Sequence, residues 1–274
     1  MRIKTASIFV LILSVLVFPM TVYCQGKWTP ENVHATLKKN NPNYNGRAQF
    51  RIESGRVVIL ELSGTGITDL SPLKQMLVQI LDLRGLPITD LSSLEGMSLA
   101  QLYLEDTGVE DLSPLKGMPL VKLYVSNTKV KDLKPLHGIP LEYLNLFGTR
   151  VDDLTPLRGM PLQFLWLNET PVSDISALAD CPLVSLTLHK TRVEDLSPLA
   201  NSRLERLHIG ETPVSDLTPL KGLSLQRLIF TSGRITKGIE IVRNMKSIQE
   251  IGPSFENRMN PEQFWTLYSQ GKFE

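Results

Sequence analysis

The side chains with most capacity for chemistry are four histidines, two cysteines and a regular series of aspartates. His189 and His208 could approach each other on neighbouring strands, beside Glu169 and Glu211. A transition-metal site needs three or four converging ligands, and no third histidine or cysteine accompanies this pair. We therefore interpret both histidines as exposed side chains, and we expect neither a metal nor another cofactor.

Sequence motifs that mark an enzyme are also missing. The chain has no H-E-x-x-H, C-x-x-C, G-x-S-x-G or P-loop pattern, so it predicts no metal pair, activated nucleophile or phosphate cradle. Its 29 basic and 28 acidic residues leave a formal net charge of +1, too little to attract nucleic acid. We expect a protein that is not an enzyme and binds no nucleic acid, with an unrecognised active site as the weakest alternative.

The aspartates recur every 21 residues without an insertion. They are Asp69, Asp90, Asp111, Asp132, Asp153, Asp174, Asp195 and Asp216. Calcium-binding β-rolls need a glycine-rich turn around each aspartate, whereas leucine and Ser/Thr-Pro follow here. We interpret the series as loop caps, in which each carboxylate accepts hydrogen bonds from its own backbone, with calcium as the weaker alternative.

The aspartate spacing belongs to a repeat that organises most of the chain. Residues 111–131 read D-L-S-P-L-K-G-M-P-L-V-K-L-Y-V-S-N-T-K-V-K, in which Leu120, Leu123 and Val125 form the pattern L-x-x-L-x-L. About six apolar columns keep this phase through eight copies. A two-residue side-chain period points these three inward and the residues between them outward, so each copy supplies one short parallel strand.

The unit resembles the short bacterial leucine-rich repeats of internalin-like surface proteins, which run one residue longer. It is also similar to the repeats found beside bacterial Ser/Thr kinases, although this chain has no H-R-D or D-F-G motif. The resemblance covers residues 57–251 and implies an α/β solenoid: a leucine-rich repeat horseshoe with a concave parallel β-sheet, convex 3₁₀ turns and a cap at each end. Strands are expected to begin near Val57, Val78, Leu99, Leu120, Leu141, Leu162, Leu183, Leu204, Leu225 and Ile248.

Other columns predict how each repeat turns. Ser113-Pro114 and its equivalents predict a hydroxyl N-cap with proline at the first helical position. A column of glycines, with Asp180 and Asn201 in two repeats, predicts a left-handed residue that ends the helical turn. A threonine column is expected to satisfy backbone groups of adjacent turns, and Cys181, in an apolar column, is expected to be a buried thiol.

The two ends of the chain differ from the repeats. Residues 1–24 carry basic residues, an apolar run and Val22 and Cys24, which predict a signal peptide cleaved after Cys24; lipidation of Cys24 and an uncleaved anchor are alternatives. Residues 25–56 predict an N-terminal cap of one helix from Thr29-Pro30 plus an antiparallel strand. Residues 252–274 predict a capping helix that begins at Asn260-Pro261.

Aromatic side chains gather at outward positions of the middle repeats. Tyr103, Tyr124 and Trp166 occupy one column of strands that lie ~4.8 Å apart, and Tyr143, Phe147 and Phe164 flank them. Arg206, His208 and Arg227 continue this surface and could receive an acidic or polar end of a ligand. We interpret these nine residues as the binding site, although cross-strand stabilisation of an exposed sheet is the simpler explanation for the aromatics.

These observations predict an exported binding module. We expect a protein or peptide partner on the concave face, with a carbohydrate ligand at the cell envelope as the alternative and a purely structural spacer as a third class. The predicted protein is a monomer that is secreted, periplasmic or on the cell surface, and it meets a membrane only through an uncleaved or lipidated N-terminus.

Overall fold

Eleven strands form one continuous sheet in chain order within residues 27–273, the part of the chain that this computed structural model describes. Strands β1 and β2 are antiparallel and all later neighbours are parallel. The elements are α1 (Pro30–Asn40), β1 (Gln49–Glu53), β2 (Arg56–Glu61), β3 (Ile80–Asp82), β4 (Gln101–Tyr103), β5 (Lys122–Tyr124), β6 (Tyr143–Asn145), β7 (Phe164–Trp166), β8 (Ser185–Thr187), β9 (Arg206–Ile209), β10 (Arg227–Phe230), α2 (Ile239–Arg243), β11 (Glu250–Gly252) and α3 (Pro261–Ser269).

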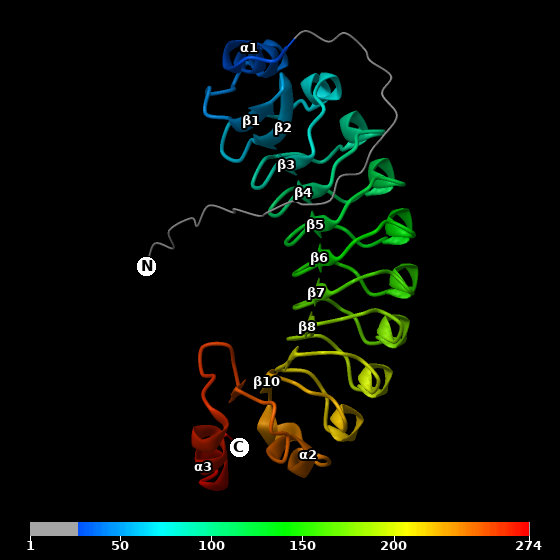
Figure 1. Cartoon of the computed structure of the whole chain (residues 1–274), viewed down its shortest axis with the longest axis vertical. Helices are drawn as coiled ribbons and strands as arrows, with labels where there is room; N and C mark the ends of the chain where they lie inside the picture. The colour runs from blue at the N-terminus through cyan, green and yellow to red at the C-terminus, as the bar shows by residue number, and fades with distance from the viewer. Residues whose placement is uncertain (1–26, 274) are drawn as a thin grey trace.

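The strands line the concave edge of a curved solenoid, and short 3₁₀ turns line its convex edge (Figure 1). The convex turns, spaced by 21 residues, are Ser71–Gln75, Ser92–Leu94, Ser113–Leu115, Lys134–Leu136, Thr155–Leu157, Ser176–Leu178, Ser197–Leu199 and Thr218–Leu220, and a further 3₁₀ turn, Ser232–Arg234, directly follows β10. This open parallel sheet confirms the predicted leucine-rich repeat horseshoe.

The paired segments are shorter than the apolar pattern indicated. Strand β2 begins at Arg56, next to the predicted Val57, but β5 begins at Lys122 rather than at Leu120, and the other strands from β3 to β11 also start two residues later than predicted. Leu120 is fully buried, but it precedes the ladder of parallel pairing. The expected starts therefore mark where side chains begin to pack in the core. The backbone pairs with the neighbouring strand only after that point.

Equivalent leucines stack in register through the core. Leu102, Leu123 and Leu144 are direct Cα partners on successive strands, and each is fully buried. Threonine side chains close the next turn: Thr128 Oγ1 donates a hydrogen bond to the Val125 carbonyl at 2.6 Å. This bond lies within one repeat, so the expectation that the threonines satisfy adjacent turns was wrong. The bond recurs at Thr65, Thr107, Thr149, Thr170, Thr191 and Thr212.

The aspartates cap the convex turns. Asp111 Oδ1 accepts a hydrogen bond from the Ser113 backbone N–H at 2.8 Å, and Oδ2 accepts one from the Ser113 hydroxyl at 2.7 Å. These bonds hold the pKa of Asp111 below its usual value. The loop-cap interpretation is confirmed, whereas the predicted hydroxyl N-cap was wrong, because the Ser113 hydroxyl donates to the carboxylate and the turn has no side-chain cap of its own.

The glycine column was interpreted correctly in only some repeats. Gly117 has a φ of 74° after Lys116 at φ −54° and ψ 126°, which is a type II corner that requires a positive φ. Asp180 and Asn201 do not adopt positive φ. The residue before Asp180, Ala179, has φ −56° and ψ −33°, so the chain continues in the right-handed region, where any residue is tolerated.

A second left-handed column, just after the strands, was not predicted. Its members are Gly64, Gly85, Asp106, Asn127, Gly148, Glu169, Lys190 and Glu211, with φ between 55° and 68°. This conformation turns the chain away from the concave face. Four members are charged residues, which cost about 1 kcal/mol each in this region, so the fold imposes the conformation against local preference.

The two ends of the solenoid are covered by additional elements. Helix α1 buries Val33 and Leu37 against the first repeat and has the capping box of Thr29 and Asn32. At the other end the chain passes through α2 and β11, returns on the concave side and ends in α3 (Figure 1). Phe264 of α3 is fully buried, with its ring centroid 5.8 Å from that of Phe230.

The N-terminal segment 1–24, for which the sequence predicts a signal peptide, lies outside the described residues. Within residues 27–273, none of the helices has the length and apolar character needed to cross a bilayer.

Replacing a stacked leucine should test the register directly. Leu144→Ala should lower the free energy of unfolding by about 2 to 5 kcal/mol, because it removes burial and leaves a cavity between two repeats. The outward change Glu142→Ala should cost no more than about 0.5 kcal/mol. Urea unfolding monitored by circular dichroism measures both, and equal losses would contradict the assigned faces.

Candidate binding surface on the concave sheet

Five aromatic rings form a continuous group on the concave face, which we call the aromatic patch. Its members are Tyr103, Tyr124, Tyr143, Phe164 and Trp166. Tyr143 and Phe164 stack with centroids 4.6 Å apart, and Phe164 stacks on Trp166 at 6.2 Å. Tyr124 meets Trp166 edge-on at 5.8 Å and Tyr103 edge-on at 5.2 Å. Five of the six predicted aromatic side chains therefore form one connected surface, and Phe147 is the exception.

Strand pairing explains why these rings meet. Tyr103 is the register partner of Tyr124, whose partner on the next strand is Asn145, followed by Trp166. The rings of Tyr124 and Trp166 are large enough to touch beside the small Asn145 side chain. Phe147 is half-buried one column away, and it stacks on no other aromatic ring of the described residues.

Tyr103 differs from the other rings in its exposure. Its side chain is only 8% exposed, and its hydroxyl donates a hydrogen bond to Gln101 Oε1 at 2.9 Å. Burial raises the pKa of Tyr103 to about 12. Tyr124, Tyr143, Phe164 and Trp166 are half-buried and offer part of their faces to a partner. Tyr103 therefore packs against Tyr124 at one end of the patch and offers a partner little exposed surface.

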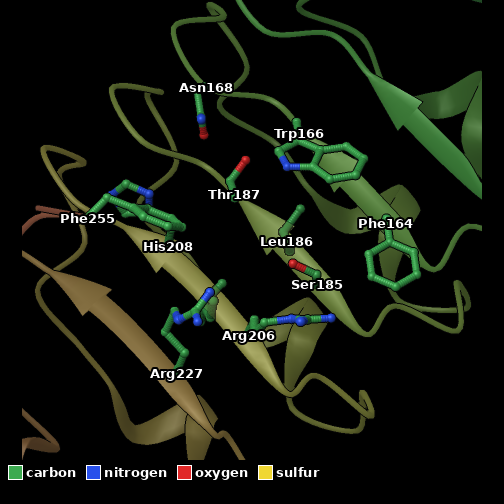
Figure 2. A pocket seen from close by; sticks show the side chains of 11 residues that line it. Phe164, Trp166, Asn168, Ser185, Leu186, Thr187, Arg206, His208, Arg227 and Phe255 are labelled. Carbon is green, nitrogen blue, oxygen red and sulfur yellow. The ribbon is translucent and has the colours of Figure 1, made fainter. Parts of the chain in front are cut away.

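A hollow of about 420 Å³ begins where the aromatic patch ends (Figure 2). Phe164 and Trp166 form one wall and Phe255, from the loop after β11, forms another. The floor comes from strands β8 to β10. The hollow, which we call the polar pocket, is lined by Phe164, Trp166, Asn168, Ser185, Leu186, Thr187, Arg206, Leu207, His208, Arg227 and Phe255.

The two histidines lie together, as the sequence suggested, but the expectation that both are exposed was wrong, because His189 is half-buried and His208 is buried. His208 is only 7% exposed, and its ring stacks on His189 with centroids 4.8 Å apart. Burial, with a smaller effect of His189, lowers the pKa of His208 to about 4. His208 is therefore neutral at pH 7. Separately, no group of three or more His, Cys, Asp or Glu side chains within residues 27–273 could hold a metal ion.

The two arginines of the predicted site have different surroundings. Arg227 Nε pairs with Glu250, so the positive charge of Arg227 is compensated. Glu250 also approaches Arg258 at 3.5 Å. Arg206 lies with its guanidinium carbon 5.7 Å from the centre of the Phe164 ring, and its buried Nε has no hydrogen-bond partner among the described residues. Of these two arginines, Arg206 is thus the one whose charge no carboxylate of the described residues compensates.

Three residues of this surface are not among the nine that the sequence predicts. Glu105 and Asn168 stand in the same outward column as Phe147 at the 21-residue spacing, so the repeat phase could have placed them. Phe255 lies beyond the repeats, and no sequence signal brings it to the concave face. Glu105 Oε2 is buried without a hydrogen-bond partner, and burial raises the pKa of Glu105 to about 7.

Comparisons with known proteins agree on the fold. An internalin (InlF) from Listeria monocytogenes superposes with a TM-score of 0.61 at 25% identity, over 81% of this chain and 68% of the internalin. Internalin C2 from the same organism gives 0.60 at 25% identity, over 77% of this chain and all of that structure. The ectodomain of the Arabidopsis thaliana receptor kinase GASSHO1/SCHENGEN3, in complex with CASPARIAN STRIP INTEGRITY FACTOR 2, gives 0.59 at 18% identity, over 71% of this chain and 26% of that ectodomain.

No protein-family model matches the sequence, and a search of curated proteins also finds no match. The class of protein therefore follows from the architecture: the chain has the leucine-rich repeat fold.

The buried carboxyl of Glu105 should make stability depend on pH. A carboxyl whose pKa is raised from 4.5 to about 7 keeps its proton longer in the folded chain, so stability falls as pH rises through this window. Glu105→Gln removes this loss. The variant's stability relative to the wild type should rise between pH 4.5 and 7, by at most about 1.4 kcal/mol per pH unit, and then level off.

Chemical denaturation of both proteins at a series of pH values measures this difference, and groups common to the two cancel. Glu110→Gln, at an exposed position, is the matched control. A Glu105→Gln difference that stays constant with pH would show that Glu105 ionises freely.

Proposed function

We propose that this chain is an exported, bacterial short-repeat binding module that holds a protein or peptide partner on its concave face and catalyses no reaction. The observation that carries the proposal is the aromatic patch, in which four half-buried rings and the buried ring of Tyr103 contact one another on the concave sheet. Tyrosine and tryptophan supply large contact areas with few rotatable bonds, and they dominate binding energy at protein interfaces. Apolar patches of this kind mark interaction sites.

The solenoid gives the patch a fixed shape. Tyr143 and Phe164 are held by paired strands and by the buried leucines directly beneath, so little order has to be created when a partner binds. Lys122 Nζ lies 4.5 Å from the centre of the Tyr143 ring, which adds a cation beside the aromatic surface. The Arabidopsis ectodomain complex is a precedent for a leucine-rich repeat fold that holds another molecule.

A carbohydrate ligand is the second candidate, and one observation favours it. The polar pocket places the unpartnered atoms Asn168 Oδ1 and Thr187 Oγ1 beside Trp166, an arrangement of amide, hydroxyl and indole that also suits a sugar ring. A glycan array probed with the full chain distinguishes the two candidates, since binding to glycans without binding to peptides would favour the sugar.

Removing two rings of the patch should weaken binding without unfolding the protein. Peptides selected on the wild-type protein from a displayed random library supply the ligand. Trp166→Ala and Tyr124→Ala should each weaken binding by more than about 1 kcal/mol, or about fivefold, because each ring is an anchor. The melting temperature should change little, since neither ring belongs to the leucine core.

The matched controls are Trp265→Ala and Tyr268→Ala, which remove rings of α3 at the C-terminal end. Unchanged affinity in the patch variants, together with weakened binding in these controls, would move the site to α3.

Export should be visible in the mass of the protein from its native host. We expect a mature N-terminus at Gln25, because the basic start, apolar run and Val22 to Cys24 fit a signal peptidase site. Intact-mass spectrometry measures this. A diacylglyceryl group on Cys24 would replace the proposal with a lipoprotein, and a retained Met1 in the membrane fraction would replace it with an anchor.

A further inference from the structure

Unpartnered buried polar atoms concentrate in the polar pocket. Seven buried side-chain atoms within residues 27–273 lack a hydrogen-bond partner, and five of them belong to Asn168, Thr187, Arg206 and His208. Buried polar atoms are nearly always paired in folded proteins, and one left unpaired costs about 1 to 3 kcal/mol. Their gathering in a single hollow indicates a ligand that supplies the missing bonds.

The chemistry of these atoms selects the ligand group. Arg206 Nε only donates, the Thr187 hydroxyl can donate, and the neutral His208 ring offers one donor and one acceptor. Three donors therefore lie along the floor of one pocket, on the neighbouring strands β8 and β9. A carboxylate is an acceptor with two oxygens and about four lone pairs, so it can satisfy all three.

The charge of the pocket favours an anion over a neutral sugar. Arg206 has no ion pair among the described residues, whereas Arg227 is neutralised by Glu250. Arg206 and Arg227 are the arginines that line the pocket, and the described lining includes no aspartate or glutamate. With Arg227 paired to Glu250, the lining leaves the positive charge of Arg206 to attract an entering carboxylate.

The walls indicate how the carboxylate arrives. Phe164, Trp166 and Phe255 stand around polar floor atoms that expose almost no surface, so a group that bonds to them must be narrow and must displace the side chains that cover them. Figure 2 shows Phe255 beside His208, and Phe255 is 40% exposed on a loop rather than on a strand. A side chain entering between these rings fits better than a peptide backbone, which is wider.

We propose that the polar pocket binds an acidic side chain of the partner, with its carboxylate on Arg206, Thr187 and His208 and a neighbouring apolar residue against Trp166 and Phe255. Asn168 Oδ1 is left to accept an N–H from the partner's backbone. This inference rests on the proposed function, because it takes the partner to be a peptide or protein segment that continues onto the aromatic patch.

A peptide library displayed with both ends blocked by carrier sequence tests the inference on the full chain. Selection on the wild type should enrich Asp or Glu next to an aromatic or large aliphatic residue. Selection on Arg206→Gln should lose the acidic preference and keep the aromatic one, and Arg206→Glu should prefer Lys or Arg instead. Arg192→Gln, at an exposed position elsewhere, should select as the wild type does.

Affinities of one enriched peptide complete the test. Glu→Gln in the peptide should weaken binding to the wild type about tenfold and should leave binding to Arg206→Gln unchanged, as expected for two directly paired charges. Thr187→Val, which keeps the shape and removes the hydroxyl, should weaken only the acidic peptide. Melting temperatures confirm that the variants are folded.

The outcomes separate the two proposals. If no peptide is enriched from the blocked library or from one with free C-termini, the proposed function fails. If peptides are enriched without an acidic residue, or if the acidic preference survives in both Arg206 variants, only the acidic side-chain inference fails. Enrichment confined to a library with free C-termini would assign the pocket to a chain end instead and would also overturn this inference.

Discussion

Each repeat of this chain is too short to enclose a core, so every inward leucine depends on the repeats on either side. Leu123 is fully buried only because Leu102 and Leu144 lie directly above and below it. Stability is therefore a sum of contacts between neighbours, and a solenoid must be closed where the neighbours run out. Helix α1 and Phe264 of α3 close the two ends.

The same register that stacks the leucines also stacks the residues between them. A 21-residue period without insertions places every outward position in a straight column, so a few substitutions in adjacent repeats create a continuous surface. Tyr143 above Phe164 becomes an aromatic stack, and Thr187 above His208 becomes a polar floor. The middle repeats thus hold an apolar surface and the later repeats a polar one, side by side on one face.

Polar side chains of the repeats are of two kinds, those with local hydrogen-bond partners and those without. Thr128 and Asp111 satisfy their own backbone through short, local hydrogen bonds, and these bonds recur along the array. Glu105 Oε2 and both ring nitrogens of His208 are buried without hydrogen-bond partners, and burial raises the pKa of Glu105 and lowers that of His208, which favours the neutral form of each. Regular columns therefore build the scaffold, while the exceptions lie on the concave face, where we propose that the partner binds.

The sequence by itself determined the horseshoe, the direction of each core leucine, the capping aspartates and the column that holds Tyr124 and Trp166, because all of these follow from a strict period and from local backbone chemistry. Only the tertiary structure decided which outward residues are sheltered. Burial of His208 depends on the rings of its neighbours, and Phe255 reaches the concave face because the chain folds back after β11. A repeat period fixes the order of residues along a column, but the exposure of a side chain depends on everything that packs around it.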